Sequence, residues 1–287
     1  MTRHFLGIPA PAKLNLFLHV LGRRADGYHE LQSVFVPTSL ADSLDFMSRA
    51  DGRIERDGDV IGDLPRDLAL RAAQLLQQAA GTPLGATITV RKRIPAGSGM
   101  GGGSSDAATT LLALNRLWSL DWPREQLLPL AGQLGADVPF FLDAGPAFVE
   151  GIGERSTALA PGALGTALWA AVVWPQVHVS TVEIFNDPNL TRSAKATIIA
   201  DFSAALSRGE PVGTNDLQPV VQQRFPEVNA ALEHLARSGA ARMTGSGSAV
   251  FARFDSEAAA QVAAASPPPG CLAWTVRLLD AHPLAAW

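Results

Sequence analysis

The stretch that decides the fold is IPAGSGMGGGSSDAA, residues 94–108. Between residues 97 and 105, every position except Met100 is glycine or serine. Residues 86–93, just before it, alternate Ile88 and Val90 with threonines, which predicts a strand. The residues after it predict a helix, because apolar side chains recur at helical spacing: Ala107, Ala108, Leu111, Leu112, Leu114 and Leu117. The expected order is therefore strand, glycine-rich loop and helix N-terminus.

This order favours a binding site for a polyphosphate. The first turn of a helix has free backbone N–H groups and carries the positive end of the helix dipole. Glycines let the backbone approach an anion without a clash from Cβ. Ser104 and Ser105 can cap the helix, or offer hydroxyls to a phosphate or its metal ion. The alternative is a flexible turn with a serine cap, but ordering so many glycines costs conformational entropy that binding would justify.

The loop differs from two common nucleotide-binding motifs. It is not a Walker A motif, because no Lys-Ser or Lys-Thr pair follows the glycines. It also departs from the Rossmann fingerprint, since the preceding segment is polar and charged and Pro95 opens the loop.

Composition argues against several classes of protein. The 287 residues are 47% hydrophobic and 17% charged, which is ample for a core and allows one large domain or two ordinary ones. The net charge of −4 gives no reason to expect a nucleic-acid or membrane-surface partner. The apolar run at 167–174 is too short to cross a bilayer.

The setting expected from the sequence is the cytoplasm. Cys271 is the sole cysteine, so an internal disulfide is impossible and a reducing compartment is the natural one. Lys13 and Asn15 interrupt the candidate signal segment near the N-terminus. The six histidines are scattered without metal-ligand spacing.

Residues 9–20 predict a half-buried strand. Its apolar face carries Leu14, Leu16, Leu18 and Val20, and its other face carries Lys13, Asn15, Phe17 and His19. Lys13 and Asn15 therefore stand side by side. A solvated edge is the alternative for that face, because lysine is mostly exposed in proteins.

Two further positions are weak signals on their own. A turn at Asp26-Gly27 delivers Tyr28 and His29 just before a second strand at 31–37, and both rings could simply pack. Asp137 precedes Val138-Pro139, so a capped helix start is the simpler interpretation of that carboxylate.

The rest of the chain predicts an α+β protein in two parts, residues 1–155 and 165–287, divided at a segment rich in glycine, alanine and proline. The expected elements are a hairpin within 44–62, helices at 67–80, 123–135 (after a possible Asp121 cap), 181–185, 193–207 and 227–237, strands at 147–154, 168–174 and 272–278, a strand pair at 241–254 around a second glycine-serine loop (244–248), and an alanine-rich helix capped by Asp255.

Four segments together resemble the GHMP small-molecule kinases and cover nearly the whole chain. They are PAKLNLFLHVLGRRADGYHEL near the start, PAGSGMGGGSSDAA in the centre, LGADVPFF after it and RMTGSGSAVFA near the end. The resemblance implies an N-terminal domain like ribosomal protein S5 and a ferredoxin-like C-terminal domain, with the active site in the cleft between them. It also implies transfer of the γ-phosphate of ATP, with Mg²⁺, to a hydroxyl group.

The N-terminal segment is similar to the branch of this family whose acceptor is the 2-hydroxyl of 4-diphosphocytidyl-2-C-methyl-D-erythritol, in non-mevalonate isoprenoid synthesis. Mevalonate- or homoserine-type acceptors remain an alternative, as does a nucleotide-binding protein without catalysis. The expected partners are these small molecules, with neither nucleic acid nor membrane, in a monomer or weak homodimer.

The resemblance assigns roles by position. Lys13 and Asp137 match the catalytic pair, which raises catalysis above capping for Asp137. Ser105 is the candidate protein ligand for Mg²⁺. The phosphate loop is matched by Pro95, Gly97, Gly99, Gly101, Gly102, Gly103, Ser104 and Ser105, and the acceptor site by Asn15 (sugar alcohol), Tyr28, His29 and Phe185 (cytosine), and Gly245, Ser246 and Gly247 (closing loop). Asp106 would repel phosphates unless it faces away or meets Mg²⁺.

Overall fold

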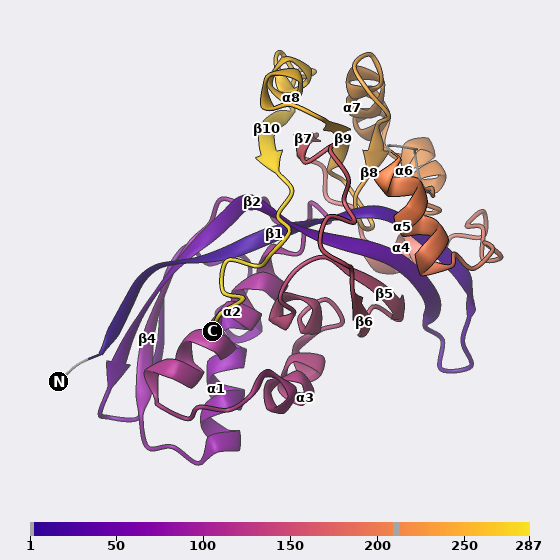
Figure 1. Ribbon diagram of the computed structural model, residues 1–287. Coiled ribbons are helices and arrows are strands. Elements are labelled where there is room, and N and C mark those ends of the chain that lie inside the picture. Colours follow the sequence, from indigo (N-terminus) through magenta and orange to yellow (C-terminus); the bar gives the residue numbers. More distant parts are fainter. Residues whose placement is uncertain (1–2, 209–212) are drawn as a thin grey trace.

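The computed structural model describes residues 3–208 and 213–287 and contains two sheets. Two long antiparallel strands, β1 (His4–Arg23) and β2 (His29–Arg49), run through the middle of the molecule. Figure 1 shows the helices of the first half on one side of this ribbon and the second sheet on the other. The expected two-domain α+β fold is confirmed.

The first sheet is built along the other edge of β2. Strand β5 (Ala147–Gly151) pairs with residues 31–35 of β2, and β4 (Gly85–Arg91) pairs with residues 43–49. The sheet is completed by β6 (Arg155–Ala158) on β5 and by β3 (Ile54–Gly58), which lies parallel to β4. The expected hairpin within 44–62 is therefore wrong, because β4 inserts between β2 and β3.

Three helices cover one face of this sheet: α1 (Leu68–Ala80), α2 (Gly102–Leu117) and α3 (Arg124–Leu134). Two short 3-10 turns, η1 (Leu64–Arg66) and η2 (Pro139–Leu142), accompany them. Apolar side chains of β2 and β4, such as Phe46 and Ile88, pack with Leu76 and Leu111 in one buried cluster. Burial of these side chains stabilises the layer by roughly 2 kcal/mol each.

The predicted caps are wrong for three helices, whereas α1 has a cap that was not predicted. Asp67 caps α1 by accepting from Leu70 N–H at 2.9 Å. Helix α2 begins after Gly101, in the left-handed region (φ 74°), so Ser104 and Ser105 lie inside its first turn. Pro123, not Asp121, is the N-cap of α3, and Ser256 rather than Asp255 caps α8 (Glu257–Ala264).

The second sheet has the strand order β10-β7-β9-β8 and is antiparallel throughout. Its strands are β7 (Trp169–Trp174), β8 (Arg242–Met243), β9 (Val250–Phe254) and β10 (Leu272–Arg277). With α7 (Pro226–Ala236) between β7 and β8, and α8 between β9 and β10, this is the ferredoxin-like topology that the resemblance implies. The segment after β7 adds α4 (Thr181–Phe185), α5 (Ile199–Ser207), which starts later than expected, and α6 (Gln218–Arg224), which was not predicted.

The free face of the second sheet packs on β1. Val172 and Phe251 share a buried cluster with Leu14, Leu16 and Phe17. Residues 10–18 of β1 are therefore buried on both faces, and the prediction of a half-buried strand is wrong. A register shift between Asn15 and Leu18 places Phe17 in the same cluster as Leu14 and Leu16, against simple alternation.

The end of the chain returns to the first half of the molecule, where Figure 1 shows it beside α2. Leu278 bridges to Thr38 of β2, and Leu284 joins the cluster under the helices. Arg124 of α3 donates to the carbonyls of Leu142, Leu284 and Trp287. In the ranges 3–208 and 213–287, no helix has the length and apolar character to cross a membrane.

Candidate active site

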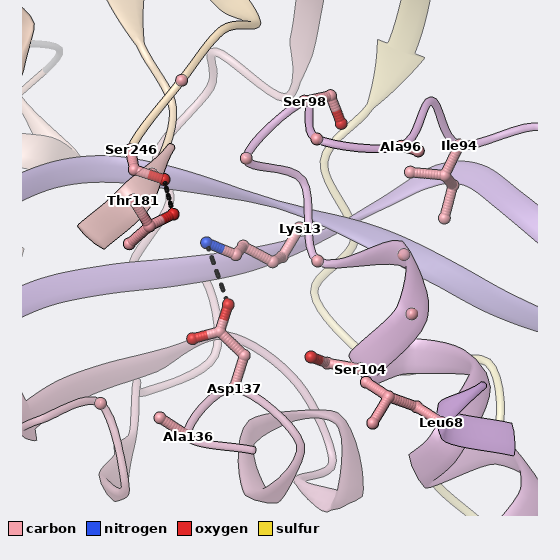
Figure 2. A pocket seen from close by; sticks show the side chains of 18 of the residues that line it. Lys13, Leu68, Ile94, Ala96, Ser98, Ser104, Ala136, Asp137, Thr181 and Ser246 are labelled. Atoms are coloured by element: carbon pink, nitrogen blue, oxygen red, sulfur yellow. Dashed lines mark hydrogen bonds and ion pairs between the residues drawn. The ribbon is translucent and has the colours of Figure 1, made fainter. Parts of the chain in front are cut away.

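A cleft of about 710 Å³ lies between the two halves of the molecule, lined by residues of both. This volume is within the range of small-molecule sites. Its walls bring together β1, the loop before α2, the turn before η2, and the loops around α4 and β8. Figure 2 shows this arrangement around Lys13.

The glycine-rich loop is held by contacts with both domains. Lys13 N–H of β1 donates to Met100 C=O at 2.9 Å, and Ala249 N–H donates to Ser98 C=O at 3.0 Å. A Cβ at Gly99 would lie 2.4 Å from Thr244 C=O, and one at Gly245 would lie 2.8 Å from Gly99 C=O. The two glycine loops therefore touch backbone to backbone, which requires glycine at both positions.

The first turn of α2 opens onto the cleft, as the sequence predicted for a phosphate site. Gly101, Gly102, Gly103 and Ser104 line it, and the Ser104 hydroxyl points toward the space beside Lys13 and Asp137 (Figure 2). The preceding loop residues Pro95, Gly97 and Gly99 also line the cleft.

Ser105 lies elsewhere. It is fully buried, and within the described chain its hydroxyl has no hydrogen-bond partner. The expectation that Ser105 could hold a metal ion is therefore wrong. Adjacent side chains of a helix point in directions about 100° apart, and here Ser104 lines the cleft while Ser105 points into the interior.

Lys13 and Asp137 meet, although they are distant in the sequence. Lys13 Nζ lies 3.5 Å from Asp137 Oδ2, and the dashed line in Figure 2 marks this ion pair. The ammonium group also lies 4.4 Å from the centre of the Phe35 ring and donates to Asn15 Oδ1. Burial lowers the pKa of Lys13, and the Asp137 carboxylate opposes that shift.

Asp137 is not a helix cap. Val138 takes the N-cap position of η2, so the carboxylate of Asp137 extends into the cleft with 34% of its side chain exposed. The capping alternative is thus excluded by the geometry. What remains is a carboxylate beside a buried ammonium group.

Asn15 joins β1 to the second domain. Its N–H donates to Thr244 Oγ1 at 2.9 Å, and its amide nitrogen donates to Ser33 Oγ at 2.9 Å. Its amide oxygen accepts from Thr244 Oγ1 at 3.2 Å as well as from Lys13. Asn15 lines the cleft but is almost fully buried, so it also fixes the position of Lys13.

The aromatic residues assigned to the cytosine are only partly brought together. The ring of His29 stacks on Phe185 with centroids 5.0 Å apart and planes 29° apart. Phe185 lines the cleft, whereas His29 lies behind it and Tyr28, which is 60% exposed, stands outside on the β1–β2 turn.

The second glycine-serine loop, residues 244–248, closes the cleft on the side opposite α2. Gly245, Ser246 and Gly247 line it, and the Ser246 hydroxyl shares a hydrogen bond of 2.7 Å with Thr181 of α4 (Figure 2). Thr181 was not predicted as a site residue. Its only signal in the sequence is its place at the start of a short helix, after the Ser180 cap.

Several other residues that line the cleft carry no signal in the sequence. His178 lies against the phosphate loop, since a Cβ at Gly97 would come within 2.8 Å of its Nδ1. Apolar Ile61 and Leu68 and the charged Arg66 also line the cleft. A single exposed histidine or a turn residue carries no pattern from which such a role could be predicted.

Asp106 lines the cleft rather than facing away from it, and its carboxylate forms an ion pair with Lys92. Its Oδ2 accepts from Lys92 Nζ at 2.7 Å, and Lys92 also donates to Asp42 at 2.5 Å. Asp42 in turn accepts from the N–H groups of Arg93 and Ile94 at the start of the loop. Burial, opposed by Lys92 and reinforced by Asp42, raises the pKa of Asp106 to about 7.

These features define what the cleft can do chemically. The N-terminus of α2 attracts anions, and a carboxylate able to accept a proton lies across from it. A buried ammonium group between them can offset negative charge on a group in transfer. The arrangement suits transfer of a phosphoryl group to a hydroxyl group.

Comparison with known proteins agrees with this geometry. The family models for the GHMP kinases N terminal domain and the GHMP kinases C terminal match residues 67–145 and 196–266. The chain is 54% identical to the 4-diphosphocytidyl-2-C-methyl-D-erythritol kinase of Methylibium petroleiphilum, over 98% of this chain and 96% of the relative.

Solved structures give the same result for the fold. A crystal structure of 4-(cytidine 5'-diphospho)-2C-methyl-D-erythritol kinase matches with a TM-score of 0.79 at 37% identity, over 97% of this chain and 99% of the other. A homoserine kinase from Cytophaga hutchinsonii matches with a TM-score of 0.74 over 98% of this chain and 96% of the other, but its 16% identity indicates the fold alone.

Proposed function

Because this chain belongs to the GHMP kinase family, we propose that it transfers the γ-phosphate of ATP to the 2-hydroxyl of 4-diphosphocytidyl-2-C-methyl-D-erythritol. The full-length identity of 54% with a kinase of that name supports the acceptor. The observation that carries the mechanism is the pairing of Lys13 with Asp137 beside the first turn of α2.

The phosphates of ATP bind to the loop and to the first turn of α2. Residues 101–104 line the cleft there, the first N–H groups of a helix have no partner within the helix, and the helix dipole adds to the attraction. The loop is held from both domains through Met100 and Ser98, so the N–H groups are in place before the nucleotide arrives.

Asp137 accepts the proton of the acceptor hydroxyl as that oxygen attacks the γ-phosphate. The P–O bond to the leaving ADP breaks as the new bond forms, and the proton ends on the carboxylate. Lys13 holds the carboxylate at 3.5 Å and offsets charge on the phosphoryl group in transfer. Asn15 and Phe35 keep the ammonium group in this place.

A magnesium ion would come with the nucleotide. No cluster of three or more metal-ligating side chains exists in the described parts of the chain, and Mg²⁺ usually keeps several water ligands beside substrate phosphates. The Ser104 hydroxyl, which faces the cleft, fits as a protein ligand in place of Ser105. The ion would neutralise phosphate charge.

The acceptor occupies the end of the cleft near α4. Phe185 supplies an aromatic face to the cleft, and His29, stacked on Phe185, brings a ring nitrogen beside it, which suits a nucleobase. Asn15, which the resemblance assigns to the sugar alcohol, lines the cleft together with the loop at 245–247. Mevalonate and homoserine offer no base for such a pocket to hold.

The test is ATP consumption with a panel of acceptors, with and without a cytidine diphosphate group. We expect turnover with the cytidylylated sugar alcohol and little with mevalonate or homoserine. In the Asp137→Asn variant the rate should fall by a factor on the order of 10² or more, with acceptor binding little changed. Near-normal turnover in a folded Asp137→Asn protein would end the role of Asp137 as base. Phosphorylation of an acceptor without cytidine at the same efficiency would refute the substrate.

A further inference from the structure

Arg192, in the segment between α4 and α5, makes an unusual contact with a histidine. Its Nε donates to His29 Nε2 at 3.1 Å. Its other nitrogens donate to backbone carbonyls: Nη2 to Phe185 and Asp187, both at 2.8 Å, and Nη1 to Leu190 at 3.1 Å. The guanidinium group is thus fixed in a ring of carbonyl oxygens at the end of α4.

A nearby carboxylate is engaged elsewhere. Asp187 accepts from Asn189 N–H at 2.8 Å and from Arg224 Nη2. Arg192 therefore directs a donor to the imidazole of His29, while its hydrogen bonds to Asp187 go to the carbonyl of that residue.

The chemistry of the two groups determines the protonation of His29. A guanidinium group has donors and no acceptor, so His29 Nε2 must present its lone pair. The ring is then neutral and carries its proton on Nδ1. Burial lowers the pKa of His29, and the charges of Arg192 and of Arg23, its neighbour across the β1–β2 pair, lower it further.

We propose that Arg192 is a positioning residue that fixes His29 as the Nδ1–H tautomer, stacked on Phe185, so that the pair offers an N–H donor to an acceptor atom of a pyrimidine base. The inference rests on the proposed function for the identity of that base. In the described part of the chain, Nδ1 has no protein partner, so it is the ring atom left for a ligand. Cytosine has two acceptors, O2 and N3, on the edge that such a donor would reach.

The same contacts join the recognition of the base to α4. Arg192 bonds the last residue of that helix, Phe185, and the ring that stacks on it, His29. A change at Arg192 should therefore alter the acceptor site and leave the phosphate loop as it is.

The direct test is the ¹⁵N spectrum of the imidazole nitrogens at neutral pH, with the signals of His29 assigned from a His29→Asn variant. We expect a protonated Nδ1 and an unprotonated Nε2 in the native protein. In Arg192→Met the ring should shift toward the Nε2–H tautomer, which free neutral histidine prefers. Arg237→Met, an exposed arginine at the end of α7, should leave the spectrum unchanged. A protonated Nε2 in the native protein would overturn the proposal even if Arg192→Met failed to fold.

The kinetic test separates this proposal from the proposed function. Losing one hydrogen bond of about 1.4 kcal/mol should raise the KM of Arg192→Met for the cytidylylated acceptor about tenfold, with the KM for ATP unchanged. Asparagine places an amide N–H near the position of Nδ1, so adding Arg192→Met to His29→Asn should cost little more.

The outcomes are distinguishable. An unchanged tautomer in folded Arg192→Met overturns the positioning role, whatever the substrate. A shift of the ring to the Nε2–H tautomer in Arg192→Met, with an unchanged KM for the acceptor, overturns the donation of a hydrogen bond from His29 to the base. Failure of the native protein to phosphorylate any cytidylylated acceptor would instead refute the proposed function.

Discussion

Gly103→Ala should separate the folding role of the phosphate loop from its binding role. Gly103 lies in the first turn of α2 and lines the cleft. A Cβ there would meet Leu68 Cδ1 at 3.6 Å, an ordinary van der Waals contact, so the protein accepts the methyl group. Gly101 is a poor choice, because its Cβ would lie 3.0 Å from Phe141 and its φ of 74° disfavours other residues.

Gly103→Ala should stabilise the folded protein and weaken the binding of ATP. Alanine in place of glycine within a helix should stabilise the protein by about 0.5–1 kcal/mol, which raises Tm by about 1–4 °C. The same methyl group occupies the wall that the phosphates approach. Losing one charge-assisted hydrogen bond there costs about 1.5–3 kcal/mol, so the Kd for ATP should rise about ten- to a hundredfold.

Calorimetric titration with ATP and thermal unfolding would measure both effects. Gly132→Ala is the matched control, since Gly132 is an exposed position in α3 where a Cβ meets nothing within 4 Å. It should raise Tm similarly and leave ATP binding unchanged. If Gly103→Ala were folded and bound ATP normally, the phosphates would not approach this turn of α2. Equal loss of ATP binding in both variants would refute the local explanation.

Three further variants test other parts of the site. Lys13→Met should lower turnover in steady-state assays by a factor on the order of 10². The double variant with Asp137→Asn should lose far less turnover than the product of the two single losses, because both residues serve one step. A loss equal to that product would contradict this. Tyr28→Ala should barely change Tm, since the ring is 60% exposed, yet weaken binding of the cytidylylated acceptor roughly tenfold if Tyr28 stacks on the base; equal weakening of ATP in the same titration would indicate a structural role. Because Asp106 has a pKa of about 7 in the folded protein and about 4 when unfolded, the folded state binds the extra proton between these values and native stability falls as pH rises through that window. Asp106→Asn should therefore gain Tm relative to the native protein from pH 5 to 8, and a constant difference would show that Asp106 does not titrate there.

Local patterns in the sequence were sufficient for much of the fold. Alternation predicted the strand before the loop, helical spacing predicted α1 and α2, and the glycine-serine loop at 244–248 predicted the turn between β8 and β9. These elements depend on neighbours within a few residues, so propensity and periodicity predict them. The phosphate site at the glycine-rich loop also follows from its own residues, whereas the roles of Lys13 and of the loop at 245–247 come from the resemblance of whole segments to a family.

What failed depended on contacts between distant segments. The 44–62 segment reads as a hairpin because its turn signals are local, but β4 takes the place beside β2. The sequence of β1 predicts a half-buried strand, because no local pattern in it indicates that the second sheet covers its other face. Ser104 and Ser105 are equivalent in the sequence, and the starting point of α2 alone decides which hydroxyl faces the cleft.

The same difference between local segments and distant contacts applies to the site. By itself the sequence determined a loop whose glycines leave backbone N–H groups accessible at a helix start, because that property belongs to one short segment. The tertiary structure decided that Asp137 does not cap η2 but lies 3.5 Å from Lys13, and that Arg192 reaches His29. Such pairs join segments more than a hundred residues apart, and their geometry exists only after the layers have packed, because hydrophobic burial rather than local preference brings those layers together.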